Sequence, residues 1–333
     1  MNFSITTSRQ IGKNKFQLPR ELHSEIFALK TRNNWYNFFA IAWDWLLIGL
    51  SICLSHWYPQ PFFYLLAIAI IGGRMRALDN IMHESSHGIL FKNPTLNKYM
   101  ACFFAAFPVF TSYTAYCLSH RNHHKYLWNY EKDPDTKRYA LFGLDAPPSD
   151  FKTFTLRHLL KPMTLIHVPR YFLGTLHANL FSQNEPAQET FLKAIYWTSV
   201  FLICHHFGIL YEFGLYWLVP FFTTFQVIRY WVEMAEHAGL RSNNPLESSR
   251  NSFGNVAERF ILQPHHDCYH LAHHLLPSIP HFNLKKAHLT LMKYQPYAEA
   301  HHCLGFFSSL IPGFQTVIED IRGPHLASKT RFS

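Results

Sequence analysis

Two long apolar runs near the N-terminus constrain this chain more than any other feature. The first covers residues 35–54 and is interrupted by Asp44, and the second begins at Pro61 after the short turn SHWYPQ. A run of about 20 apolar residues is long enough to cross the hydrocarbon core of a bilayer as a helix. The second run passes into RMRALDNIMHESSHG without a strong helix breaker. Together the two runs predict a helical membrane hairpin.

Two further apolar runs, at about 190–208 and 214–229, predict a second hairpin of the same kind. The leader 1–34 is polar and basic, which places the N-terminus in the cytoplasm by the positive-inside bias. Because helices satisfy every backbone group within lipid, we expect an all-α integral membrane fold with four transmembrane helices in two hairpins and a cytosolic helical cap. The chain would form a single domain, 1–333, whose N-terminal segment, membrane hairpins and cap cover 1–34, 35–240 and 241–333.

The apolar run from Tyr99 to Leu118 leads directly into the sequence SHRNHHKY. If this run crossed the membrane once, the histidines of HESSH before it and of HRNHH after it would lie on opposite faces. We therefore expect the run to be re-entrant or interfacial. The alternative is that the two histidine-rich motifs are unrelated.

The composition agrees with a membrane protein that also has a large polar part. The chain is 48% hydrophobic, yet its mean hydropathy is only −0.07, so apolar and polar segments must alternate. A net charge of +9 beside apolar segments favours contact with a membrane surface, and the sequence has no motif that points to nucleic acid. The six cysteines form no CxxC pair, which argues against a disulfide framework or a cysteine-type zinc site.

Histidine is the unusual residue of this chain, with 23 copies, and three short motifs carry the most informative ones. HESSH places two imidazoles at i and i+4, on one face of a helix. HRNHH and HLAHH each place two imidazoles on one face and a third beside them. Eight imidazoles exceed what one tetrahedral zinc takes and suit two metals that prefer imidazole, iron foremost. The eight are His83, His87, His120, His123, His124, His270, His273 and His274, and a plausible ninth, after the last apolar run, is His237.

Two other readings of the histidines stay open at this point. HESSH also fits the HExxH motif of zinc metalloproteases, in which Glu84 would be the general base. Several histidines have no partner at ligand spacing, and we expect them to be interfacial or surface residues: His158, His167, His177, His205, His206, His301 and His302. For His265 and His266 two alternatives are equally open: they support the metal ligands from behind, or they have no role in the site.

The three motifs and their surroundings resemble the histidine boxes of the integral-membrane fatty acid desaturase superfamily. The stretches that carry the resemblance are NIMHESSHG at 80–88, HHKYLWNYEKDPD at 123–135 and YHLAHHLLPSIPHFNL at 269–284. The resemblance implies a non-haem di-iron enzyme that uses dioxygen on fatty acyl chains, with four membrane helices beneath a cytosolic cap. It also implies that the eight box histidines, and His237 near the last membrane helix, bind the iron.

The chain departs from the family pattern at two positions. Ala272 stands where many acyl-lipid desaturases have Glu, and Glu233 stands where acyl-CoA desaturases have an Asn one turn before the extra histidine. Glu233 is therefore either a water-bridged ligand or the partner of a nearby Arg. Asp79, and Asp133 or Asp135, are candidates to orient imidazole N–H groups, with helix caps or turns as the alternative.

The chemistry of two irons and dioxygen requires an external source of electrons. Reducing dioxygen to two waters takes four electrons, of which the substrate supplies two in a desaturation. The sequence has no Cys₄ iron–sulfur spacing and no haem-binding domain of the cytochrome type, so we expect a separate donor protein, a ferredoxin or a cytochrome b-type carrier with its reductase. The basic cytosolic face would suit an acidic donor.

The leading functional hypothesis is thus a membrane fatty acyl desaturase. Related oxidations on the same scaffold stay open, namely those of a hydroxylase, a ketolase, an acetylenase or an alkene-forming decarboxylase. An intramembrane zinc protease built on HESSH is a distant alternative, and a passive metal carrier is least favoured. We expect a bacterial inner membrane, or else the endoplasmic reticulum, with the active site on the cytoplasmic side.

Overall fold

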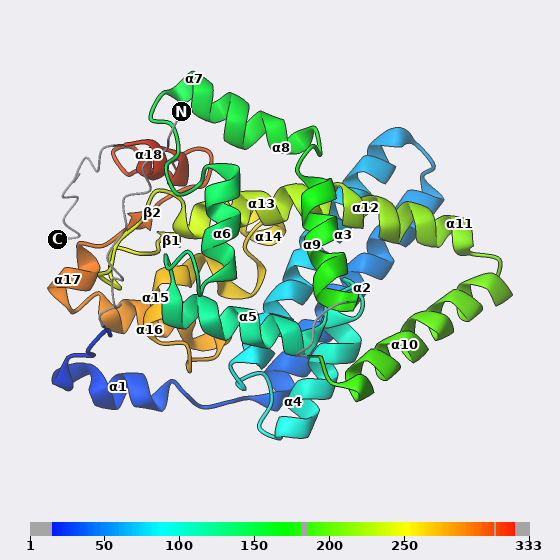
Figure 1. The fold of residues 1–333 in the computed structure, drawn as a ribbon, viewed down its shortest axis with the longest axis horizontal. Helices are drawn as coiled ribbons and strands as arrows, with labels where there is room; N and C mark the ends of the chain where they lie inside the picture. Colours follow the sequence, from blue (N-terminus) through cyan, green and yellow to red (C-terminus); the bar gives the residue numbers. More distant parts are fainter. Residues whose placement is uncertain (1–14, 181–184, 310, 324–333) are drawn as a thin grey trace.

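The computed structural model of the chain describes residues 15–180, 185–309 and 311–323, so residues 1–14 of the expected cytosolic leader lie outside it. Helices dominate this part of the chain (Figure 1), which confirms the all-α prediction in outline. The strands of the described residues, β1 (Asn251–Ser252) and β2 (His302–Cys303), form one parallel pair of two residues each.

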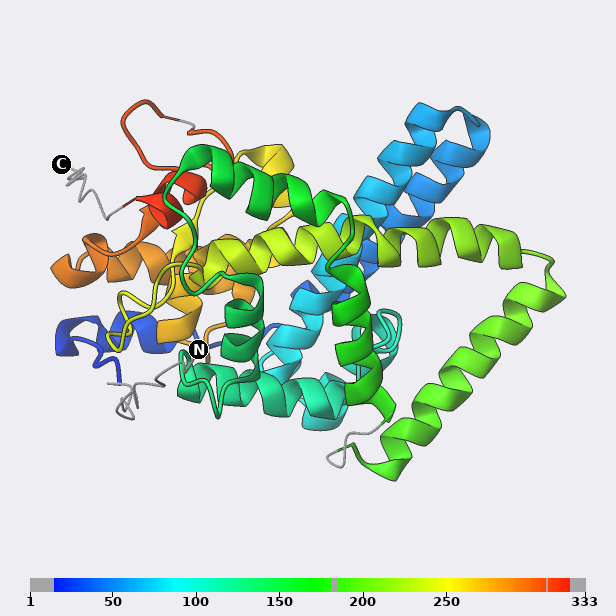
Figure 2. The ribbon, with the colours of Figure 1, turned by 45° about the horizontal axis from the view of Figure 1, so that its top comes forward.

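The first predicted hairpin is formed by the long helices α2 (Asn34–Trp57) and α3 (Pro61–Ser86). The Asn33 side chain caps α2 by accepting a hydrogen bond from the backbone N–H of Tyr36, and Pro61 occupies the first turn of α3, where its missing N–H costs nothing. These are the two helices of the described chain that are long and apolar enough to cross a membrane. Their far ends project from the rest of the molecule (Figure 2).

The second predicted hairpin is present as helices, but it is less regular than the first. Helix α10 (Ala187–His206) leads into a segment that runs nearly in line across the molecule (Figures 1 and 2). That segment consists of α11 (Leu210–Phe213), the π-helix η4 (Gly214–Leu218), α12 (Val219–Phe222) and α13 (Thr224–His237). Because neither arm matches α2 and α3 in length and hydropathy, the topology of four crossings stays a prediction.

The apolar run 99–118 does not form one straight helix. It is divided between α4 (Pro94–Ala101), the π-helix η2 (Cys102–Ala106) and α5 (Tyr113–Tyr126). Between them the chain turns through Phe110, whose φ of 57° lies in the left-handed region, and the Ser112 side chain caps α5. This reversal brings HRNHH on α5 back to the end of α3.

The remaining elements are short and surround the ends of α3 and α13. Between α5 and α10 the chain forms α6 (Pro134–Phe142), α7 (Phe151–Phe154), η3 (Thr155–Leu160), α8 (Lys161–Met163) and α9 (Val168–Leu180). The C-terminal part contains α14 (Val256–Ile261), η5 (Pro264–Tyr269), α15 (His270–Leu275), η6 (His281–Asn283), α16 (Leu284–Leu291), α17 (Gln295–Ala298) and α18 (Val317–Arg322). The N-terminal η1 (Arg20–Leu22) and α1 (His23–Ala28) pack on α16 through Leu22 and Ile26.

The crossing of α3 and α13 fixes the centre of the molecule. At Gly72 a Cβ atom would meet the Thr224 side chain and would lie 2.9 Å from the backbone nitrogen of Phe225. The hydroxyl of Thr224 donates a hydrogen bond of 2.6 Å to the carbonyl of Ile68, which locks the same crossing. A larger residue than glycine would therefore separate the two helices.

A buried arginine attaches the C-terminal part to the end of α13. Arg250 is fully buried and donates hydrogen bonds to the carbonyls of Ala235 and Ala238, at 2.9 and 2.7 Å, and to the Asp320 carboxylate of α18 at 2.8 Å. A cation is favourable there because the carbonyls at a helix C-terminus have no intrahelical partner. Arg250 thereby holds the turn that contains His237.

We expect Gly72→Val to destabilise the protein by about 1–3 kcal/mol, because overpacking forces α3 and α13 apart. Gly49→Val on α2 is the matched control, since no atom of another residue lies within 4 Å of a Cβ added there. Thermal unfolding of both variants in detergent measures the difference. Equal melting temperatures would show that α3 and α13 do not cross closely at this glycine.

Candidate metal centre

Nine histidines from four helices converge at the inner ends of α3 and α13. His83 and His87 lie at the end of α3, the HRNHH histidines lie on α5, and the HLAHH histidines lie on α15. The ring centres of His83 and His273 are 4.3 Å apart, and those of His123 and His237 are 4.9 Å apart. The three boxes therefore lie together in the folded chain, as expected from the sequence, and a metal site shared by them stays a prediction.

The nine imidazoles divide into two groups, each of which could hold a metal ion. Within each group the candidate ligand nitrogens all lie within 4.8 Å of one another. The first group consists of His83, His87, His120, His124 and His273, and the second of His123, His237, His270 and His274.

The second group brings nitrogen lone pairs face to face. The Nε2 of His237 lies 3.2 Å from the Nε2 of His123 and 2.9 Å from that of His270. The Nδ1 of His237 lies 2.9 Å from the Ser248 carbonyl, which can only accept, so Nδ1 carries the proton and Nε2 is left as a lone pair. The Nδ1 of His123 faces the Asp133 carboxylate at 3.4 Å, which selects the same tautomer. Two neutral lone pairs at this distance repel unless a cation lies between them.

The first group shows the same convergence with fewer supports. The Nε2 atoms of His87 and His120 are 2.9 Å apart, and those of His124 and His273 are 3.1 Å apart. Nitrogens that bind one metal at right angles, each about 2.1 Å from it, lie about 3 Å apart. The Nε2 of His83 is buried and has no hydrogen-bond partner among the described residues.

Burial keeps these rings in the neutral form that a metal requires. Burial lowers the pKa of His87 to about 4 and lowers the pKa of His124 and His274 far below the ordinary value for histidine. Neighbouring imidazoles add to the effect for His124 and His274. Both ring nitrogens of His274 are buried without a hydrogen-bond partner in the described chain, which is costly for a polar group unless a ligand engages it.

Asp133 lies where the sequence predicts a carboxylate behind the ligands. It caps α6 by accepting a hydrogen bond from the N–H of Asp135, and its other oxygen accepts one of 2.6 Å from the Thr136 hydroxyl. Burial alone would raise the pKa of Asp133, but His123 and these hydrogen bonds lower it to about 2. The carboxylate is thus fixed and ionised beside His123, and Asp135 also approaches that ring, at 3.4 Å.

Glu233 takes the ion-pair arrangement of its two predicted alternatives. Its oxygens accept hydrogen bonds from Arg138 at 3.0 Å, from Arg229 at 3.1 Å and from the Tyr171 hydroxyl at 2.6 Å. Burial would raise the pKa of Glu233, but the two arginines outweigh it, so the pKa is lowered. Glu233 belongs to neither histidine group.

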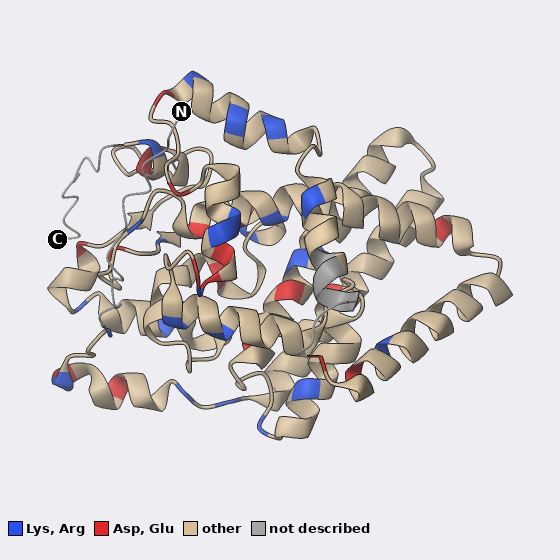
Figure 3. Cartoon of the chain, in the orientation of Figure 1, with Lys and Arg blue, Asp and Glu red and all other residues tan. Residues whose placement is uncertain are grey.

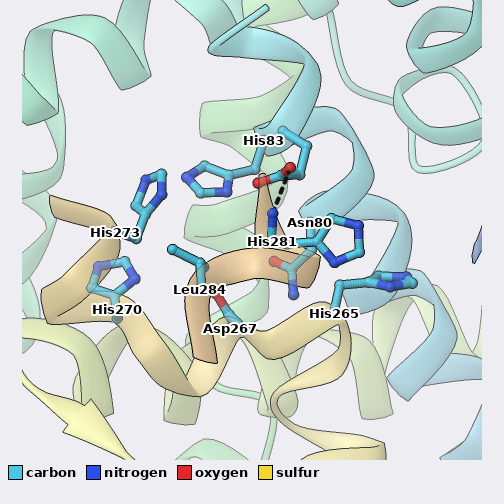
Figure 4. A pocket seen from close by; sticks show the side chains of 9 residues that line it. Asn80, His83, His265, Asp267, His270, His273, His281 and Leu284 are labelled. Atoms are coloured by element: carbon cyan, nitrogen blue, oxygen red, sulfur yellow. Dashed lines mark hydrogen bonds between the residues drawn. The ribbon is translucent and has the colours of Figure 1, made fainter. Parts of the chain in front are cut away.

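Asp79 and Glu84 differ from the sequence-based hypotheses in their contacts. Asp79 makes no hydrogen bond to an imidazole, or to any other described residue, and lines a cavity of about 130 Å³ that also borders His83, His120 and His270. Glu84 accepts a hydrogen bond of 3.0 Å from the backbone N–H of His281, drawn in Figure 4 with the converging rings of His83, His270 and His273. That contact occupies the carboxylate on which a protease mechanism would depend.

Two of the histidines expected at the surface are buried, so that prediction is wrong for them. His158 is 2% exposed and contacts the Tyr230 hydroxyl at 2.8 Å, and His167 is 5% exposed and lies 3.2 Å from the Gln226 carbonyl. His205 and His206 on α10 are exposed, as predicted. His301 and His302 are half-buried, and the side chain of His177 lies outside the described part.

Sequence reasoning missed a polar cluster in the hairpin of α2 and α3. Asp44, which interrupts the first apolar run, is fully buried and pairs with Arg74 of α3 at 3.0 Å. It also lies 2.7 Å from the Nε2 of His265, so this histidine contacts α2 and not the box imidazoles. The sequence did contain a signal for this cluster. Asp44 and Arg74 are charged residues in or beside apolar runs, and such a charge is costly without a partner.

Comparison with known proteins agrees with this geometry. A family model described as "Fatty acid desaturase" matches residues 55–305. The chain belongs to the fatty acid desaturase family. It is 33% identical over 300 residues to dihydrorhizobitoxine desaturase of Bradyrhizobium elkanii, which covers 85% of this chain and 82% of that protein.

Other relatives in the family are less similar. An sn-1 acyl-lipid omega-3 desaturase (ferredoxin) of Synechocystis is 25% identical over 262 residues, which cover 72% of this chain and 69% of that protein. An endoplasmic reticulum omega-3 fatty acid desaturase of Nicotiana tabacum is 26% identical over 275 residues, covering 72% and 67%. As a member of the desaturase family the chain is an oxidoreductase, which excludes the zinc protease.

We expect Glu233→Gln to lower the free energy of unfolding by about 1.5–3 kcal/mol, because Arg138 and Arg229 lose their charged acceptor. Folding lowers the pKa of Glu233. The stability that its ion pairs contribute is therefore complete above the pKa of Glu233 in the unfolded chain, about 4.3, and is lost as the pH falls below that value. Thermal unfolding between neutral and acid pH measures this, with the exposed Glu131→Gln as control. A wild-type advantage that persists or grows under acid conditions would contradict the ion-pair assignment.

Proposed function

We propose that this protein is a membrane-bound, dioxygen-dependent desaturase whose nine converging histidines hold two iron ions. The observation that carries the proposal is the position of the His237 Nε2, which lies 3.2 Å from the Nε2 of His123 and 2.9 Å from the Nε2 of His270. At least two of them present lone pairs, which a shared cation would turn from a repulsive into an attractive arrangement. Imidazole ligands suit iron, and two nitrogen groups suit two ions.

Iron at these two positions would supply the activation of dioxygen that removal of hydrogen from an unactivated methylene requires. Two hydrogens leave adjacent carbons, a C=C bond forms, and two waters are made with two further electrons and two protons. The residues of this chain have supporting roles. Asp133 and the Ser248 carbonyl hold the His123 and His237 rings in the ligand tautomer, and Arg250 holds the turn behind His237.

The exposed apolar side chains support a membrane location for the two hairpins. Trp43, Leu50 and Leu65 on α2 and α3, and Phe201 and Leu202 on α10, are each more than half exposed. An exposed apolar surface of this extent marks a contact with lipid or protein. The projecting ends of α2 and α3 carry no Lys, Arg, Asp or Glu (Figure 3). We propose four crossings in two hairpins, with the metal centre on the cytoplasmic side of a bacterial inner membrane or of the endoplasmic reticulum.

The names of the relatives support two further parts of the proposal. Ferredoxin appears in the name of the Synechocystis enzyme, which supports a separate iron–sulfur electron donor, with a cytochrome b-type carrier as the alternative. The names of these relatives indicate two kinds of substrate for them, acyl lipids and dihydrorhizobitoxine. Acyl-chain desaturation, as expected from the sequence, is thus one of two supported substrate classes. Hydroxylation and the other oxidations remain open, and an oxygen-containing product would reveal them.

We expect the purified protein to contain about two irons per chain, and His237→Ala to contain about one, because His237 belongs to only one histidine group. Elemental analysis of protein expressed with iron measures both. His206→Ala, an exposed histidine on α10, is the control and should keep both irons. Zinc in place of iron, or iron content unchanged in His237→Ala, would contradict the proposal.

We expect Asp133→Asn to weaken metal binding at the second group by about 10–100-fold, because the carboxylate that orients His123 is lost. Asparagine preserves the helix cap, so α6 should remain intact. Asp150→Asn is a matched control, because Asp150 also caps a helix but is not near a box histidine. Competition with a coloured chelator measures the affinities, and equal values for the two variants would reject an orienting role for Asp133.

A further inference from the structure

The cavity beside the histidines is lined by polar side chains throughout. It has a volume of about 130 Å³ and lies between α3, α5, α6, α13, η5 and α15, where it borders His83, His120, His123 and His270. Three arginines and five carboxylates line it, together with tyrosine, serine, asparagine and histidine, and no aliphatic side chain does so among the described residues.

Most of these charges are already engaged in ion pairs with one another. Arg76 binds Glu236 at 3.0 Å and Asp267 at 2.6 Å. Arg138 binds Asp135 and Glu233, each at 3.0 Å. These pairs fix the walls of the cavity, so its lining is rigid and charged before any ligand enters.

Asp79 is the exception among the carboxylates. It is 9% exposed, and neither an ion pair nor a hydrogen bond to it exists in the described structure. Arg229 and Arg76 both interact with Asp79 electrostatically, but neither comes within ion-pair distance of it. The hydrogen bond of Arg229 to Glu233 uses Nε, so its two Nη groups are not engaged in that contact. A buried carboxylate and a guanidinium thus face the same cavity with a gap between them.

An acyl chain is a poor match for such a cavity. It would displace water from charged groups and replace none of the lost hydrogen bonds, which is costly for each buried polar group. A molecule with an ammonium and a carboxylate group would instead find a partner for each of its charges in this cavity. The ammonium would bind Asp79 and the carboxylate would bind the Nη groups of Arg229, each as a charge-assisted hydrogen bond.

We propose that the cavity between Asp79 and Arg229 binds a small zwitterion of the amino-acid type, and that this zwitterion, not an acyl chain, is the substrate that the enzyme desaturates. The inference rests on the proposed desaturase function and specifies its substrate class. The two charged groups anchor one end of the molecule, and the carbon chain then extends along the histidine wall. Tyr116, whose ring stacks on that of His120 at 5.5 Å, forms part of this wall.

The test is equilibrium dialysis of the full-length protein in detergent, read by mass spectrometry. The probes are the standard L-amino acids with norvaline and norleucine at millimolar concentration, their N-acetyl and methyl ester derivatives, and stearate. We expect at least one free amino acid to be retained and its N-acetyl derivative, which lacks the ammonium, to bind about tenfold or more weakly. We expect the same loss for the free amino acid with Asp79→Asn, whereas the exposed Glu131→Gln binds as the wild type does.

Three results would overturn the proposal. They are the absence of retention of every free amino acid, equal retention of free and N-acetylated forms by the wild type, and desaturation of stearoyl lipid by the iron-loaded enzyme with its electron donor. The comparison of free and acetylated probes uses only the wild type, so it decides the matter even if Asp79→Asn fails to fold. Desaturation of stearoyl lipid would reject the zwitterion and uphold the desaturase, whereas a protein that binds no iron would reject the desaturase itself.

Discussion

The convergence of neutral imidazoles is the interaction on which the rest of this structure depends. Rings whose lone pairs face one another at about 3 Å repel, and burial prevents them from relieving the repulsion by protonation. Such an arrangement persists only if the surrounding structure over-determines it or a cation occupies it. Here three of the four helices that contribute a ring are fixed from behind: α3 and α13 cross at Gly72, Ser112 caps α5, and Arg250 binds the last carbonyls of α13. The fold itself therefore holds these rings close together.

The parts of this centre that sequence reasoning found are those with a local pattern. HESSH, HRNHH and HLAHH each place their rings by helical spacing within a few residues, and an apolar run precedes each of the first two motifs. The parts of the site that the sequence did not predict depend on backbone groups from other segments of the chain. The acceptor behind His237 is a main-chain carbonyl of Ser248, which any residue type could provide. The partner of Glu233 could be narrowed to an arginine. Arg229 lies one turn before Glu233 on the same helix, whereas the second partner, Arg138, comes from α6 and follows only from the folded arrangement.

The wrong assignments of His158 and His167 have a related cause. Histidine is amphipathic, and without periodic neighbours the sequence gives no sign of whether a ring meets water or a buried hydroxyl. In the folded chain the two rings contact the Tyr230 hydroxyl and the Gln226 carbonyl, both supplied by α13. The second hairpin was harder to define for a different reason. The π-helix η4 and the irregular backbone at Thr223 divide the second arm of that hairpin into short pieces, so apolar composition outlines it only roughly.

The two ends of helix α3 differ in character: the first part is apolar and the last turns are charged. Its first part, from Pro61 to Gly73, carries no charge and packs or faces outward as a membrane segment does, whereas its last turns carry Arg76, Asp79 and His83 into a charged cavity. The apolar hairpin therefore supports the proposed membrane location and does not by itself specify what the protein oxidises. Because electrostatic recognition is strong where water is scarce, a polar molecule held at the membrane boundary can be bound more selectively there than in bulk solvent. A membrane anchor and the proposed zwitterionic substrate are thus compatible within one helix.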